Sequence, residues 1–295
     1  MGWLWAVFTI VAAGAQTFRN AMQKELTTTL GTVGATHVRF LFGLPFAILF
    51  LLTAVLIIGA PPALNATMLG WTFVGGIAQI AATALLLAAM QERSFVVTIA
   101  LSKTEPVHVA VFGLVFLGDH LTSGLAVAIV LATVGVMMMS WPRQTTGQTL
   151  SWNSAALGIG SGALFGLAAV GFRGGIQALE TDSFVLAALT TLVVGLIIQT
   201  LTLTAYLLIR DRANLIAIFK AWRPSIKAGF MGAFASQMWF LAFALESAAK
   251  VRTLALVEIL FAQLVTRQMF KQNMGSREAI GIGLIVVGMI LLLNS

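Results

Sequence analysis

The sequence of 295 residues has no cysteine, one tyrosine, three histidines and only 9% charged residues. The lack of cysteine excludes disulfide bonds, thiol catalysis and cysteine-ligated metals. His37, His108 and His120 lie on different segments without the spacing of metal ligands, so we predict neither a metal site nor a cofactor. A soluble domain usually has about a quarter of its residues charged. The low charge therefore argues against a soluble globular protein.

What the chain has instead is a 59% share of hydrophobic residues. Ten apolar segments are long enough to cross a bilayer. They span approximately residues 2–23, 33–59, 66–90, 94–117, 121–141, 154–177, 183–209, 224–246, 250–270 and 276–294. The first lacks a positively charged start, so we expect no cleavable signal peptide. We predict an all-α integral membrane protein with ten transmembrane helices, in which only residues 145–153 and 210–223 form longer loops.

The net charge of +7 has a simple explanation in such a protein. Lys and Arg beside membrane helices orient them, so nucleic acid is not predicted as a partner. Cations gather near the loops that follow odd-numbered helices, which places those loops in the cytoplasm and both termini outside.

The fourth segment carries charge in the middle of an apolar run. Lys103, Glu105 and His108 lie there, where each charge is costly and usually faces a partner or a water-filled cavity. Pro106 has no N–H for the carbonyl of Ser102, so it is expected to break the helix and to act as a hinge. This pattern predicts a pathway for a polar substrate. The alternative is a structural ion pair that locks two helices together.

The two halves of the chain match at nearly one offset. The pairs are Phe18-Arg19 with Phe172-Arg173, Glu105 with Glu258, Ser123 with Ser276, and Val134-Gly135 with Val287-Gly288. They predict a duplicated unit, with a five-helix repeat over residues 1–143, a linker over 144–153 and a second repeat over 154–295. Because five is odd, the copies enter the membrane from opposite sides. Inverted repeats of this kind are characteristic of secondary transporters.

The 5+5 helices, the Glu105-Pro106 dipeptide in the fourth helix, the aligned Glu258 in the ninth and the length resemble the EamA branch of the drug/metabolite transporter superfamily. Within it, the chain is most similar to bacterial amino-acid exporters of the YddG type. The resemblance implies a basket of helices around a central cavity, alternating access, and export of amino acids or related metabolites across the inner membrane. It also implies cytoplasmic termini, against the charge count.

A zwitterionic amino acid needs a cation for its carboxylate, an acid for its ammonium group and a pocket for its side chain. The predicted substrate-binding residues are Gln16, Gln79, Lys103, Glu105, His108, Gln237, Trp239 and Glu258. The two Glu are also candidate proton carriers, with protons as a coupling ion, whereas a Lys or Arg partner would make them scaffold. Arg19, Arg39 and Arg173 are expected to hold helix ends.

Three functions remain open at this point: export of neutral or aromatic amino acids, efflux of cationic drugs or polyamines, and an intramembrane enzyme. Drug efflux would favour unpaired Glu, and an enzyme would need a catalytic set that the spacing does not offer.

Two further expectations concern movement and packing. Ile259 aligns with Pro106, so we predict a break in the first half only and asymmetric bending. Gly158, Gly162 and Gly166 are spaced for the close approach of another helix.

Overall fold

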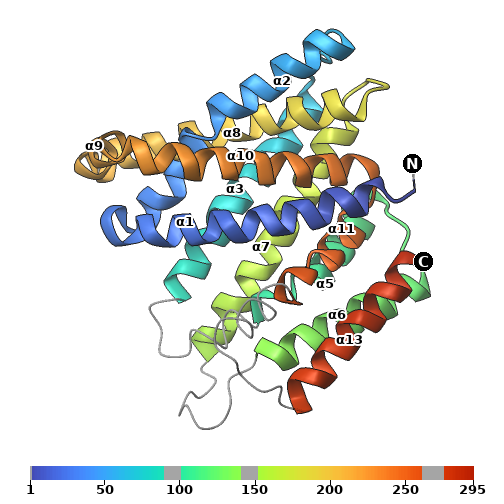
Figure 1. Cartoon of the computed structure of the whole chain (residues 1–295). Helices are drawn as coiled ribbons and strands as arrows, with labels where there is room; N and C mark the ends of the chain where they lie inside the picture. The colour runs from blue at the N-terminus through green and yellow to red at the C-terminus, as the bar shows by residue number, and fades with distance from the viewer. Residues whose placement is uncertain (1, 90–100, 141–151, 261–275) are drawn as a thin grey trace. The chain divides into compact units, whose positions relative to one another are not determined.

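The computed structural model of the chain describes residues 2–89, 101–140, 152–260 and 276–295 (Figure 1). Every regular element in these ranges is a helix, and seven of the described helices are long and apolar enough to cross a membrane. The chain forms two compact units. Unit 1 comprises Met1–Ile77 and Gly171–Glu246, and unit 2 comprises Ala78–Val170 and Ser247–Ser295. Each unit therefore takes helices from both predicted repeats.

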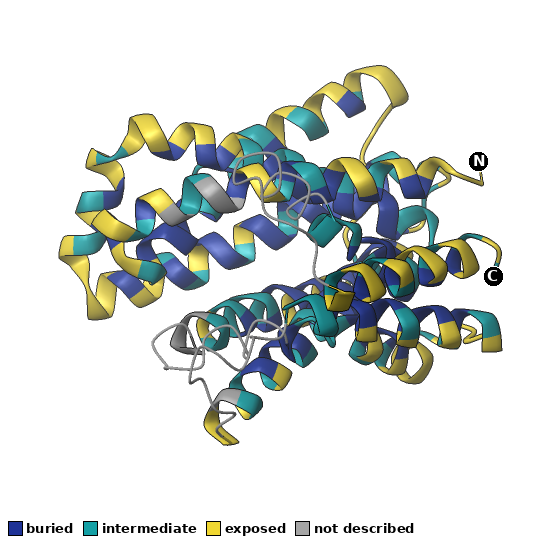
Figure 2. Cartoon of the chain, turned by 60° about the horizontal axis from the view of Figure 1, so that its bottom comes forward, coloured by how far each residue is buried: buried dark blue, intermediate teal, exposed yellow. Residues whose placement is uncertain are grey.

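Unit 1 is built around long apolar helices. Its elements are α1 (Leu4–Leu41), α2 (Leu44–Ile58), the start of α3 (Ala66–Ala89), the end of α7 (Trp152–Gln177), α8 (Phe184–Arg210), α9 (Arg212–Lys220) and α10 (Trp222–Leu245). In Figure 2 the buried faces are dark blue and the exposed faces yellow. The exposed face of α2 carries Leu49, Leu52 and Leu56, which are 56%, 54% and 87% exposed. Such a surface suits lipid rather than water.

The connection expected between the first two spans is mostly helical, and α1 consists of two helices that meet within it at a kink. Gly31 alone has a non-helical backbone, with φ 61° and ψ −178°, and bends the helix there. The bend frees the carbonyl of Leu30, which accepts a hydrogen bond from Asn214 Nδ2 at 3.0 Å. Gln23 Nε2 donates to the carbonyl of Ala35 across the same bend at 3.0 Å. Side chains that are distant in the sequence thus stabilise this bend.

Two other boundaries differ from the prediction. The second span is divided at Phe42–Gly43, and Pro45 lies in the first turn of α2, where its missing N–H costs nothing. The predicted loop 210–223 contains the nine-residue helix α9. Asp211 caps that helix by accepting a hydrogen bond from Asn214 N at 3.0 Å.

Unit 2 contains the remaining elements. They are the end of α3, α5 (Glu105–Phe112), the π-helix η1 (Gly113–Leu117), α6 (Ser123–Ser140), the start of α7, α11 (Ala248–Leu254) and α13 (Ser276–Leu293). The fourth and ninth predicted spans are described only in part. The linker at 144–153, residues 94–100 and residues 261–270 of the predictions lie largely or wholly outside the described residues.

Helices α6 and α13 pack through glycine. A Cβ on Gly135 would lie 2.6 Å from the carbonyl oxygen of Gly281 and 2.9 Å from Ile285 Cγ1. A Cβ on Gly288 would lie 3.0 Å from the carbonyl oxygen of Ala128 and 3.0 Å from the backbone nitrogen of Ala132. The contacts run in opposite directions along the two helices, so the helices are antiparallel, and only glycine lets their backbones come this close.

Candidate functional site

The helix of the fourth segment is interrupted at its charged residues. Lys103 and Thr104 form a turn, and α5 begins at Glu105 with Pro106 in its first turn. The turn is held by hydrogen bonds from Thr104 N to the Leu101 carbonyl at 3.1 Å and from Val107 N to the Thr104 carbonyl at 3.0 Å. The predicted break is therefore confirmed, and Pro106 occupies a position where proline is tolerated.

Glycines of α7 lie against this break. A Cβ on Gly162 would be 2.9 Å from the carbonyl oxygen of Ser102, which is the carbonyl that Pro106 cannot serve. A Cβ on Gly166 would be 3.2 Å from His108 Cβ and from Val109 N. At these two positions the predicted close approach of another helix is confirmed. The α7 backbone thus covers the chain on both sides of the break.

A second break lies in the ninth segment, so the prediction of a break in the first half only is wrong. α11 ends at Leu254, and Ala255–Leu256 form a turn before the helix resumes. Leu256 N bonds to the Thr253 carbonyl and Ile259 N to the Leu256 carbonyl, each at 3.1 Å. No proline lies at this break, and the Thr253 hydroxyl just before it donates to the Ala249 carbonyl at 2.7 Å. Such hydroxyl bonds often bend helices.

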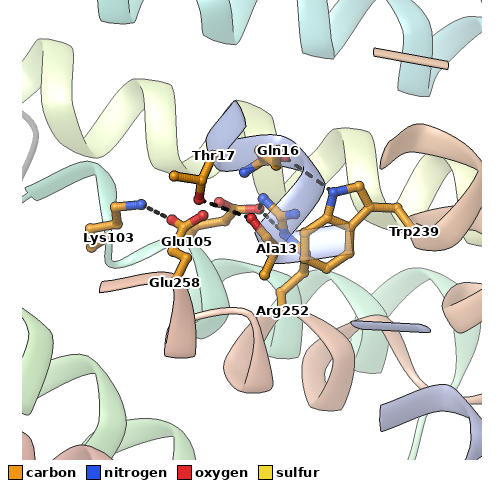
Figure 3. Close-up of polar contacts among 8 residues, drawn as sticks. All are labelled: Ala13, Gln16, Thr17, Lys103, Glu105, Trp239, Arg252 and Glu258. Atoms are coloured by element: carbon orange, nitrogen blue, oxygen red, sulfur yellow. Dashed lines mark hydrogen bonds and ion pairs between the residues drawn. The ribbon is translucent and has the colours of Figure 1, made fainter. Parts of the chain in front are cut away.

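Two ion pairs join the two broken segments (Figure 3). Lys103 Nζ pairs with Glu258 Oε1. Arg252 contacts Glu105 Oε1 through both Nε and Nη2, each at 2.5 Å. The four side chains are only 13–26% exposed. Each broken segment therefore supplies one cation and one acid, and the attraction between them offsets part of the cost of removing the charges from water.

Arg252 is the partner that the sequence prediction did not place in the site. It lies near the predicted start of the ninth span and resembles a charge that only orients the helix. Its position six residues before Glu258, on the far side of the second break, gave no separate signal. The pairing is the arrangement named as the alternative in the sequence prediction, ion pairs that lock two helices.

The other predicted site residues divide between the units. His108 Nδ1 lies 3.1 Å from the Thr104 carbonyl oxygen, so that nitrogen must carry the proton in a hydrogen bond. In unit 1, Trp239 Nε1 donates to Gln16 Oε1 at 3.1 Å and joins α10 to α1. Gln79 lies on the part of α3 in unit 2, and Gln237 is half-buried on α10 in unit 1.

Arg173 holds a helix end, as expected for it. Its Nη1 donates to the carbonyls of Phe243, at 3.2 Å, and of Glu246. These carbonyls belong to the C-terminal end of α10, where a cation is favoured. Across the described ranges, no three His, Cys, Asp or Glu side chains are grouped so that they could hold a metal.

The N-terminal part of the chain is similar to known transporters. A model of the EamA-like transporter family matches residues 1–141. The matched segment includes the first broken helix with Lys103 and Glu105, and the match indicates a membrane transporter of the drug/metabolite type. No curated protein matches the chain.

Solved structures share the fold. One of 28 matching chains, described only as a crystal structure of a protein, has a TM-score of 0.71 and 14% sequence identity to this chain. The similarity covers 98% of this chain and 95% of the other. At this identity the likeness shows the fold alone. The closer resemblance to amino-acid exporters stays a prediction.

Pro106→Ala tests the hinge role of the proline. Because the second segment breaks without proline, we expect the first break to persist and turnover to fall only a few-fold, with substrate affinity nearly unchanged. Distances between spin labels on α5 and α6, and on α11 and α13, would measure bending in both segments. A helix that runs without interruption through Lys103 and Thr104, or a complete loss of transport in this variant, would contradict the expectation.

Proposed function

We propose that this chain is a secondary transporter that exports amino acids, chiefly neutral or aromatic ones, across the cytoplasmic membrane by alternating access. The observation that carries the proposal is that two ion pairs, Lys103–Glu258 and Arg252–Glu105, join two broken helices in an otherwise apolar unit. Charges at membrane depth are rare and mark substrate and ion pathways. Breaks in such helices free backbone groups, which is tolerated where protein or a water-filled cavity satisfies them.

A zwitterion suits this arrangement because it carries both charges of an ion pair. Its carboxylate can replace Glu105 at Arg252 or Glu258 at Lys103, and its ammonium group can take the released acid. After the exchange every charge of the protein still has a partner of opposite sign, so neither acid is left uncompensated in an apolar environment. In this state the cation partners tie Glu105 and Glu258 to the scaffold, so either acid becomes a candidate carrier of a coupling proton only when the substrate has displaced it from its cation.

The repeat supports alternating access. Gly135 contacts Gly281 and Ile285, and Gly288 contacts Ala128 and Ala132. Each residue of the first half corresponds to one of the second half at an offset of 153: Gly135 to Gly288, Ala128 to Gly281, and Ala132 to Ile285. Glu105 and Glu258 share this offset, and each accepts a cation from the other broken segment. These relations favour ten helices in two inverted five-helix repeats. In transporters of that design, one part rocks against the other around the substrate.

Efflux of cationic drugs or polyamines is the second candidate function. It would be favoured by acids that are open to a cationic ligand, whereas Glu105 and Glu258 each have a cation of the protein as a partner. A cationic ligand would have to displace Arg252 or Lys103 and leave that cation buried without an acid, which is costly.

The deciding experiment is transport by the purified chain in proteoliposomes. We expect uptake of labelled neutral or aromatic amino acids, competition between them, and a rate that responds to an imposed pH gradient. Cells that make the protein should tolerate toxic analogues of these amino acids. Transport of cationic dyes without transport of any amino acid would replace the proposal by the drug-efflux function.

A further inference from the structure

The segment between α8 and α10 is strongly basic. Residues 210–227, called here the basic segment, contain five cations and one acid. The cations are Arg210, Arg212, Lys220, Arg223 and Lys227, and all are exposed. The acid, Asp211, already accepts the hydrogen bond from Asn214 N that caps α9. The segment therefore presents a net positive charge to its surroundings.

Helix α9, at the centre of the basic segment, is apolar on two sides. One side is buried, since Leu215 and Ile218 pack into a core with Leu207 and residues of α1. The other side is exposed, with Ile216 at 57%, Phe219 at 56% and the following Trp222 at 50%. A helix on a water-exposed surface usually has polar residues on its outer face. The outer face of α9 is therefore suited to a medium less polar than water.

The position of α9 is set by its neighbours. α8 ends at Arg210 and α10 begins at Trp222, and both are long enough to cross a membrane, whereas α9 has only nine residues. Figure 1 shows α9 beside the joined ends of these two helices. A short helix between the ends of two spans lies at the membrane surface.

We infer that the basic segment is a binding surface for the headgroups of anionic phospholipids, with the outer face of α9 embedded in the membrane interface. Helices with Phe or Trp toward lipid and Lys or Arg beside them bind interfaces in this way. The Arg223 guanidinium carbon lies 5.5 Å from the centre of the Trp222 ring. Since Trp prefers the headgroup level, this contact holds a cation where lipid phosphates lie. The inference does not depend on the transported substrate.

The experiment uses the full chain, which has no cysteine of its own. Ala213→Cys, at an exposed position of α9, carries a fluorescent label in vesicles of phosphatidylcholine and phosphatidylglycerol. Quenching by brominated phosphatidylglycerol is compared with quenching by brominated phosphatidylcholine, and the ratio gives the relative affinity for the two lipids. We expect a clear preference for phosphatidylglycerol that weakens as salt is raised.

Charge variants locate the surface. Arg212→Gln and Lys220→Gln should each reduce the preference by up to about five-fold, because a cation near an anionic membrane contributes about 1 kcal/mol. Arg212→Lys should keep it. Arg277→Gln is the matched control, since Arg277 is an exposed cation at the start of α13 in unit 2. Unchanged thermal unfolding shows that each variant is folded.

Three results would overturn the inference. The first is equal quenching by the two brominated lipids. The second is an equal loss of preference in Arg277→Gln and in Arg212→Gln. The third is that millimolar glycerol phosphate, added to the vesicles, removes the preference for phosphatidylglycerol. That result would show a site for free phosphate instead of a lipid surface.

Discussion

Glu105→Gln and Lys103→Ala are each expected to abolish or strongly reduce transport while the protein remains in the membrane. Each change removes one partner of an ion pair and leaves the other charge, Arg252 or Glu258, in apolar surroundings. Breaking a buried pair in this way costs about 3–5 kcal/mol, more than removing both partners. Transport in proteoliposomes and thermal unfolding in detergent would measure the two effects separately.

Double variants separate a structural role from a role in transport. Arg252→Gln combined with Glu105→Gln should regain much of the stability that either single change loses, because no uncompensated charge remains. We expect transport to stay low in this variant. The exchange Lys103→Glu with Glu258→Lys restores the pair and should restore the most activity. Wild-type transport rates in both Glu105→Gln and Lys103→Ala would show that the broken segments are not the substrate site.

Gly135→Leu is expected to destabilise unit 2 strongly. A Cβ at this position would already lie 2.6 Å from the carbonyl oxygen of Gly281 and 3.0 Å from the backbone nitrogen of Ile285. Neither backbone atom can move without moving α13, so a cost of about 3 kcal/mol or more is expected. The measurement is the yield of monodisperse protein and its unfolding temperature.

Gly283→Leu provides the matched control. Gly283 lies on the exposed side of α13, and a Cβ built on it would meet no atom within 4 Å. The same substitution should therefore change the unfolding temperature little. If both variants lost stability equally, the close contact of α6 and α13 would not be the reason.

Features that depend on local chemistry were predictable from the sequence. Pro106 removes a backbone donor, so the break beside Glu105 follows from the residue type alone. Gly162 and Gly166 have the spacing of one helix face, so the close approach of another helix to α7 was predictable from that spacing. The all-helical fold followed in the same way from the length of the apolar runs.

Features that depend on distant partners were not predictable. At the kink of α1 the Leu30 carbonyl accepts a hydrogen bond from Asn214, which is 184 residues away along the chain. Arg252 became part of the site only through its contact with Glu105, 147 residues earlier. The break after Leu254 has no proline and is accompanied by a Thr253 hydroxyl bond that many unbroken helices also contain. In each case the deciding interaction is tertiary, and no spacing in the sequence marks it.

The contact between α6 and α13 is of the kind that two identical subunits make across a two-fold axis, where each presents the same patch to the other. In a homodimer, one sequence would have to satisfy both sides of that patch. In a single chain the sides are free to diverge, and they have: Gly135 meets Gly281 and Ile285, whereas Gly288 meets Ala128 and Ala132. Beside Gly135, the volume that Ile285 has beyond the corresponding Ala132 is offset by Gly281, which is smaller than the corresponding Ala128. Exchanging these residues between the two helices would therefore disturb the packing, although the glycines at its centre correspond.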